Sequence, residues 1–437
     1  MNQFGTGTRS LGCRSNEEKS LQTEDLIVLG FISTFALLVL LGTLVDIALK
    51  HDLADDLIPD KAIAFLQGFS AYITLKKVFQ VSPTNTANNL SCINGIRFLS
   101  MAWVIFGHSY MHIVQDLPFQ ANFLKLYDDW SNSVGLRILY NASPSTDSFF
   151  LIGSTLLSYL TLSQLEKHGS SLKFWILYYV HRYLRLTGVY IFVIAIAATL
   201  MRYMSIGPHH FLEPEVEACR QSWWSNLLYI NNFDPEAGRE RCIGPTWYMA
   251  VDMQFYLVSP LFILPLFYTP MAGIILNSAA IAGSVAYRMY KAYCEREDFT
   301  FNTVYIKPWT RISVYTTGLL LGFLLFKTKQ KQIKLNFFIV MVGWVVAIST
   351  TSAVIFGIDI DQTKLSDIDF MFYQGLFRTV WGWALAWMIF MCVKVKNFLR
   401  TISSPFYNHW PCNGLKNFLF EFFSYLRELT CNPPNVH

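Results

Sequence analysis

An arginine and a histidine, Arg97 and His108, lie eleven residues apart in one apolar stretch of the sequence. A helix rises 1.5 Å per residue, so the two side chains would be roughly 16 Å apart along it, about half the thickness of the hydrocarbon layer. A cation at the mouth of a span suits the phosphates of an activated donor such as a thioester, and a buried imidazole suits removal of a proton from an acceptor hydroxyl. The alternative is an arginine that snorkels to the interface and a histidine satisfied by helix packing.

Other polar residues in or beside apolar stretches are candidates for the same chemistry, because ionisable groups are costly inside a membrane span. Asp147 precedes the stretch that begins at Phe149, where a carboxylate can orient His108 or instead cap the helix. Arg182 and Arg185 share one helical face and can grip phosphates at the cytosolic interface, or can simply anchor a membrane helix. Four more are expected to line a path for the acceptor or to pair with each other: Asp252, Gln254, Arg311 and Arg378.

The composition indicates that lipid surrounds the elements that position these residues. Of the 437 residues, 53% are hydrophobic and 15% are charged, whereas about 25% are charged in soluble proteins. The sequence therefore predicts an all-α, polytopic bundle of transmembrane helices with about nine spans. The runs long enough to cross ~30 Å of hydrocarbon are 27–49, 96–114, 149–165, 186–204, 247–267, 271–290, 309–326, 335–357 and 372–393.

The basic residues in alternate loops orient these spans. They gather on one side, which is predicted to be cytosolic, and they place the N-terminus outside the cell or in the ER lumen. Cys219 and Cys242 then share an outer loop where oxidation is allowed, so they are a candidate disulfide, with two free thiols as the alternative. Asn141 begins a glycan acceptor on the outer side, whereas the acceptor at Asn89 is cytosolic and is expected to stay bare.

Other classes of function lack support in the sequence. The net charge of +4 is spread between loops without a basic block interleaved with aromatic residues, so no nucleic-acid partner is predicted. The eight cysteines include no CxxC pair and no Cys/His cluster at metal spacing, so no metal site is predicted. The expected domains are an outer or lumenal segment at 1–26, a transmembrane domain at 27–393, and a divergent cytosolic or interfacial tail at 394–437.

Several motifs follow one another in a characteristic order. They are Asn94-Gly95-Ile96-Arg97 with Gly107-His108, then Asp147-x-Phe149-Phe150, then Tyr179-x-x-Arg182-x-x-Arg185, then the segment from Thr246 to Tyr256. Over roughly residues 25–393, this order resembles the acyltransferase 3 family, and more closely its animal branch named for nose resistant to fluoxetine.

The resemblance implies transfer of an acyl group from a cytosolic thioester, usually acyl-CoA, to an acceptor on the outer or lumenal face. Arg97 and His108 match the family's Arg-x10-His motif, Asp147 matches its acidic residue before the paired phenylalanines, and Arg182 and Arg185 match its paired arginines. The implied mechanism has His108 as general base, Asp147 orienting it, and the three arginines holding the phosphates of the donor.

Further expectations concern the binding partners and the cellular location of the protein. Acyl-CoA is expected as a co-substrate, without a bound cofactor. The expected partners are membrane lipid, the acyl donor and an acceptor that the sequence does not name, and both homo- and hetero-oligomers remain open. The expected location is the ER or the plasma membrane.

The sequence departs from the family pattern in three places. The family continues Asp-x-Phe-Phe-x-x-Ser-Gly, whereas the corresponding pair here is Gly153-Ser154. About 25 residues precede the first span, so the cysteine-rich outer domain of animal members is expected to be missing, and the last helices of the family are expected to be missing too. These departures keep open a transporter of lipids or small molecules without covalent chemistry, and an inactive family member.

Overall fold

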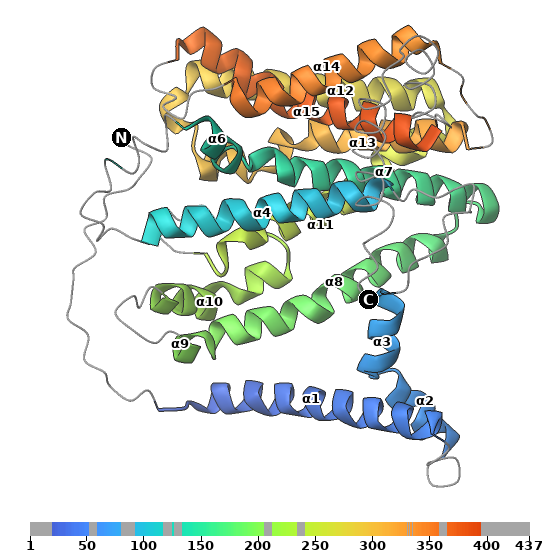
Figure 1. Cartoon of the computed structure of the whole chain (residues 1–437), viewed down its shortest axis with the longest axis vertical. Coiled ribbons are helices and arrows are strands. Elements are labelled where there is room, and N and C mark those ends of the chain that lie inside the picture. The colour runs from blue at the N-terminus through green and yellow to red at the C-terminus, as the bar shows by residue number, and fades with distance from the viewer. Residues whose placement is uncertain are drawn as a thin grey trace, which may run out of the picture. The chain divides into compact units, whose positions relative to one another are not determined.

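The computed structural model describes residues 20–51, 59–79, 92–116, 125, 133–204, 212–233, 241–329, 331, 333, 335–357 and 365–394. Every regular element in these ranges is a helix, so the predicted all-α fold is confirmed. The helices divide between two compact units, which are described separately below (Figure 1). The predictions for Asn89 and for the tail after Lys394 fall outside the described residues.

The larger unit comprises residues 86–186, 224–238 and 244–437. Besides the part of α8 (Leu172–Ala198) up to residue 186, it contains α4 (Cys92–Asp116), α6 (Val134–Tyr140), α7 (Ser143–His168), α11 (Trp247–Tyr268), α12 (Pro270–Cys294), α13 (Ile312–Lys327), α14 (Phe337–Phe356) and α15 (Asp367–Lys394). Short helical turns at Gly244–Thr246, Arg296–Asp298, Phe301–Tyr305 and Pro308–Thr310 lie between the long helices.

Seven helical stretches in the described residues are long and apolar enough to cross a membrane. These are Thr23–Lys50, Val134–His168, Leu172–Ala198, Gly244–Tyr268, Pro270–Cys294, Phe337–Phe356 and Asp367–Lys394. The shorter apolar helix α13 and the 25-residue helix α4 coincide with the two remaining predicted runs. The predicted boundary that differs most is the start of α8, which lies at Leu172 rather than at 186, because the basic residues in the first half of this helix lower the hydropathy there.

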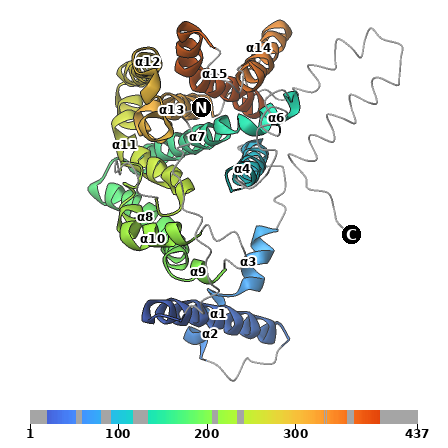
Figure 2. The same ribbon diagram turned by 90° about the vertical axis from the view of Figure 1, so that its left-hand side faces the viewer.

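The centre of the larger unit is the contact between α7 and α13, which lie side by side in both views (Figures 1 and 2). A Cβ atom added at Gly318 would overlap Ser154 Oγ and the backbone of Leu151, and one added at Gly322 would overlap the backbone of α7 further along. Ser158 Oγ donates a hydrogen bond across the same contact to the Leu319 carbonyl (2.9 Å). Small residues therefore allow the two backbones to approach closely, as is typical of helix pairs in membranes.

Two prolines, Pro260 and Pro265, lie inside α11, yet the helix continues through both. A proline has no N–H, so Pro260 leaves the carbonyl of Tyr256 without its usual helical donor. Ser259 Oγ donates to that carbonyl instead (2.7 Å). A freed backbone acceptor at membrane depth is thus satisfied by a neighbouring hydroxyl, as the absence of water in lipid requires.

The smaller unit comprises residues 1–85, 187–223 and 239–243. It contains α1 (Thr23–Lys50), α2 (Asp60–Gln67), α3 (Ala71–Val78), α9 (Met201–Met204) and most of α10 (Leu212–Leu227). Asp25 is fully buried, forms an ion pair with Arg202, and accepts a hydrogen bond from Tyr203 Oη (2.6 Å). Both contacts are made to Oδ2, so one oxygen of the carboxylate at the start of the first span is satisfied by this pairing.

Candidate active site

A buried ion cluster joins three helices of the larger unit. The Asp147 carboxylate on α7 accepts hydrogen bonds from Arg311 Nη1 (2.6 Å), just before α13, and from Arg378 Nη1 (2.8 Å) on α15. The side chains of Asp147, Arg311 and Arg378 are 0%, 0% and 4% exposed. An unpaired carboxylate is very costly at such depth, so Asp147 needs the two opposite charges that the arginines supply.

A third arginine, Arg288 on α12, is also fully buried in this region. It donates to the carbonyl oxygens of Thr310 (2.9 Å) and Gly375 (2.8 Å) and to Thr379 Oγ1 (3.0 Å). These partners of its Nη atoms are neutral, so they do not cancel its charge. The three arginines and Asp147 together carry a net charge of +2, since three positive groups face one negative group.

Aromatic rings surround one of these cations. The Arg311 guanidinium lies 4.5 Å from the centre of the Trp247 ring and 4.4 Å from that of Tyr305. Both contacts have the geometry of a cation–π interaction. Arg311 Nη2 is buried and has no hydrogen-bond partner in the described residues, so the cluster keeps one donor that an acceptor oxygen can use.

A second ion pair joins α8 to α11. Arg182 bonds to Asp252, and its guanidinium lies 4.3 Å from the centre of the Tyr256 ring. The Tyr256 ring also stacks on the Tyr178 ring, with 4.2 Å between the ring centres. This stacking fixes the orientation of the ring that Arg182 covers. Arg185 is exposed on the same helix, so the two arginines that the sequence pairs have different surroundings.

Tyr248 follows Trp247 at the start of α11, and its ring centre is 4.7 Å from that of Phe150. The charges of Arg97, Arg182, Arg311 and Asp252 all act on its hydroxyl. Side chains from α4, α8, α11 and the start of α13, three of them positive and one negative, therefore lie near this phenol. In the sequence, Tyr248 stands out only as part of a motif, because nothing in the spacing of the residues indicates which charged groups surround it.

His108 is exposed on α4, and its Nδ1 lies 2.9 Å from the carbonyl oxygen of Val104. A carbonyl oxygen only accepts hydrogen bonds, so Nδ1 is the donor in this contact. Both oxygens of Asp147 accept from arginines, as described above. The orientation of His108 by Asp147 therefore stays a prediction, and the structure instead joins Asp147 to Arg311 and Arg378.

The remaining candidate residues lie outside this ion cluster. Gln254 Nε2 donates to Asn232 Oδ1 (2.7 Å) and so ties α11 to the segment after α10. Asn141 Nδ2 donates to the Ile355 carbonyl (2.9 Å), and glycosylation at this residue stays a prediction. In the part of the chain that the structure describes, no three His, Cys, Asp or Glu side chains form a group that could hold a metal ion.

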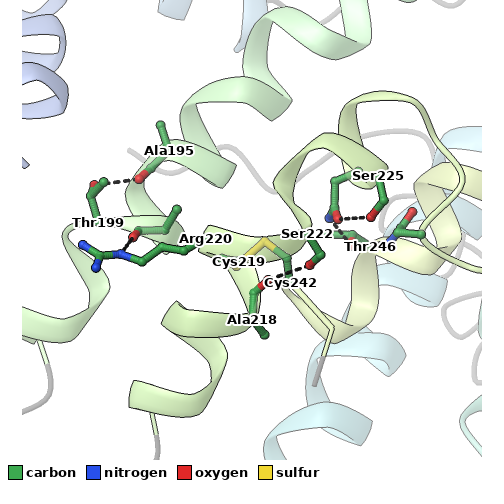
Figure 3. The surroundings of a disulfide bond; sticks show 12 residues. Ala195, Thr199, Ala218, Cys219, Arg220, Ser222, Ser225, Cys242 and Thr246 are labelled. Carbon is green, nitrogen blue, oxygen red and sulfur yellow. Dashed lines mark hydrogen bonds between the residues drawn. A yellow bond between two sulfur atoms is a disulfide. The ribbon is translucent and has the colours of Figure 1, made fainter. Parts of the chain in front are cut away.

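Cys219 on α10 and Cys242 form a disulfide within the smaller unit. Figure 3 shows this bond together with Arg220, the residue after Cys219, whose Nε donates to the Ala198 carbonyl at the end of α8 (3.1 Å). The disulfide and this hydrogen bond both hold α10, so the segment between α8 and α11 is tied down at two adjacent residues.

The acyltransferase domain model matches residues 90–410, which is most of the chain. The chain belongs to the acyltransferase 3 family. Within this family it is similar to nose resistant to fluoxetine protein 6 of Caenorhabditis elegans, at 28% identity over 87% of this chain and 51% of the relative.

It is also similar to the regulator of hypoxia-inducible factor 1 of the same organism, at 23% identity over 59% of this chain and 55% of the relative. The chain thus spans about half the length of the curated relatives it matches. No solved structure matches it. The ion-paired and cation–π residues of the larger unit described above, from Asp147 to Arg378, all fall within the part that matches the acyltransferase 3 family.

Proposed function

We propose that this protein transfers an acyl group within the membrane, from a cytosolic thioester such as acyl-CoA to an acceptor on the outer or lumenal side. The proposal rests on family membership, and one structural observation carries it further. Arg97 on α4, Arg182 on α8 and Arg311 at the start of α13 lie near enough for their charges to act on the Tyr248 hydroxyl, together with the opposite charge of Asp252. An excess of positive charge in a low-dielectric bundle favours an anionic ligand such as the donor.

His108 is the proposed general base. Its Nε2 removes the proton from the hydroxyl or amine of the acceptor, and the acceptor atom forms a bond to the thioester carbonyl carbon. The carbon–sulfur bond breaks, and the CoA thiolate leaves and takes up the proton from His108. The products are the ester or amide and free CoA, so atoms and charge balance.

The arginines divide into two roles in this proposal. Arg97, Arg182 and Arg185 are exposed or half-buried, so they are available to the phosphates of the donor. Arg311 is buried and keeps one unused N–H, which suits the oxygen that becomes negative when the carbonyl is attacked. Asp147 acts as a positioning residue, since it holds Arg311 in place.

The experiment measures CoA release from palmitoyl-CoA by the purified protein in nanodiscs, with cell-derived lipids and sterols as acceptors. His108→Ala is expected to lower turnover by about 10²–10⁴-fold, the usual contribution of a general base. His181→Ala is the matched control, because His181 is an exposed histidine on α8 to which no role is assigned. Arg182→Ala is expected to weaken donor binding.

Three outcomes would contradict the proposal. Full turnover in His108→Ala would exclude His108 as the general base. Monodisperse wild-type protein that neither binds palmitoyl-CoA nor releases CoA would indicate an inactive family member. Substrate flux across a proteoliposome membrane without consumption of thioester would indicate a transporter.

A further inference from the structure

The first span of the smaller unit ends in a helical corner. After α1, the chain turns through α2, whose backbone at Leu66 lies directly against Gly42, where a Cβ atom would overlap the Leu66 carbonyl. Helix α3 then runs crosswise to α1 at its C-terminal end, as Figures 1 and 2 both show. Ser70 Oγ donates to Asp46 (3.1 Å), and the Ala71 N–H donates to Thr43 Oγ1 (3.0 Å). These bonds fix the start of α3 against α1.

A cavity of about 560 Å³ lies in this corner, between the end of α1 and α3. It has room for a phosphate-bearing headgroup, since ligand pockets commonly begin near ~300 Å³. Three of its lining residues are lysines and one is an aspartate, so the lining carries a net charge of +2. The lining residues are Asp46, Leu49, Lys50, Tyr72, Ile73, Lys76 and Lys77.

The charged groups of the cavity differ in how far they are already engaged. Asp46 accepts the hydrogen bond from Ser70 described above, and Lys50 Nζ donates to Tyr72 Oη (2.9 Å). That hydrogen bond and the charge of the ammonium group lower the pKa of the Tyr72 phenol. Lys76 and Lys77 are exposed, and no acidic partner lies within 4 Å of either one among the described residues. Their charge is available to a ligand.

Apolar side chains stand exposed beside this basic cavity. Val78 is 70% exposed and Phe79 is 77% exposed, and Leu75 on the same helix is 53% exposed. A short helix that is basic on one face and apolar on another, placed crosswise at the end of a span, is suited to lie in the membrane interface. Soluble surfaces do not usually expose such side chains together.

We propose that this cavity binds the phosphate headgroup of an anionic phospholipid, with Val78 and Phe79 inserted among the acyl chains beside it. The lysines attract the headgroup phosphates, and the Tyr72 hydroxyl adds a hydrogen-bonding group. The apolar rim distinguishes a lipid from a free phosphate compound, because only the lipid brings acyl chains to it. This site belongs to the smaller unit, whereas the proposed acyl-transfer residues belong to the larger one, and the proposal does not depend on the proposed catalysis.

The test measures binding of a fluorescent dioctanoyl phosphatidylinositol 4-phosphate to the full chain in detergent. Dioctanoyl phosphatidylcholine, inositol 1,4-bisphosphate and CoA serve as competitors. The variant Lys76→Gln/Lys77→Gln is expected to bind about 30-fold more weakly, because each basic residue near an anionic surface contributes a factor of about five. The matched control is Lys167→Gln/Lys173→Gln, which removes two exposed lysines elsewhere.

A second variant, Val78→Ser/Phe79→Ser, separates the two sources of phosphate. It is expected to bind the lipid more weakly and to bind inositol bisphosphate as tightly as wild type does. The proposal is overturned if phosphatidylcholine competes as well as the anionic lipid, if the lysine variant binds like wild type, or if inositol bisphosphate or CoA binds as tightly as the lipid. CoA release in phosphatidylcholine nanodiscs is expected to be the same for both variants and wild type.

Discussion

Neutralising the buried carboxylate at the centre of the ion cluster tests how this bundle is held together. In Asp147→Asn, the side chain keeps its size and loses its charge, while Arg311 and Arg378 lose the negative group that each one contacts. With Arg288 nearby, the net charge of the cluster rises from +2 to +3. The variant is therefore expected to fold less stably.

The expected magnitude follows from burial. Breaking one fully buried ion pair costs about 3–5 kcal/mol, because the remaining charge is left uncompensated. Asp147 takes part in two such pairs, so a loss of at least about 3 kcal/mol is expected, against a total stability of typically ~5–15 kcal/mol. In a thermal scan, this corresponds to a lower midpoint by on the order of 3–5 °C, because the unfolding entropy of a chain of 437 residues is about 0.9 kcal/mol/K.

The assay is thermal unfolding of purified protein in detergent, followed by tryptophan fluorescence and by the loss of monodisperse protein. Asp367→Asn is the control, since Asp367 is 65% exposed and pairs with Arg296 at the surface. Its midpoint is expected to change little, because exposed ion pairs contribute about 0–1 kcal/mol. The double variant Asp147→Asn/Arg378→Met returns the cluster to +2 and is expected to recover part of the loss. If Asp147→Asn unfolds at the wild-type midpoint, the cluster does not stabilise the bundle and the reasoning is wrong.

Three further outcomes are expected. Reduction of the bond between Cys219 and Cys242, which are 23 residues apart, should lower the stability of the smaller unit by about 3 kcal/mol. A mass increase of two hydrogen atoms on reduction of the peptides that contain these cysteines checks that the bond is present, and an unchanged mass would contradict it. Gly318→Ala should lower the unfolding midpoint, because its methyl group would overlap the backbone of α7 and overpacking costs about 1–3 kcal/mol, whereas Gly153→Ala has open space and should not. Arg182→Ala should raise the KM for palmitoyl-CoA more than it lowers kcat, and an unchanged KM in steady-state kinetics would exclude this arginine from donor binding.

The reversed pair Gly153-Ser154 now has a structural interpretation. The Ser154 side chain is fully buried and lies opposite Gly318, so α13 fits against α7 only because residue 318 has no side chain. Gly153 has open space at its Cβ position. The change of order therefore concerns the contact between two helices and does not by itself argue against catalysis.

The sequence by itself determined the fold class, and it identified several of the charged residues that form the buried ion cluster. Lipid permits few structures, and a helix needs about 20 apolar residues to cross it, so long apolar runs identify helices without knowledge of their packing. The cost of burying charge likewise singled out Asp147, Arg311 and Arg378 as residues that need partners. The same rule could have indicated Arg288, which is a basic residue inside the predicted run 271–290.

Only the tertiary structure decided which of these residues meet. Asp147 pairs with arginines 164 and 231 positions away in the sequence, rather than with the histidine that its motif suggested. Several cations were available to the carboxylate, and a periodic pattern shows which face of a helix is polar without showing which helix that face meets. The cavity beside α3 likewise depends on a corner between helices. Pairing at long range is set by how the whole bundle packs, and no local pattern in the sequence contains that information.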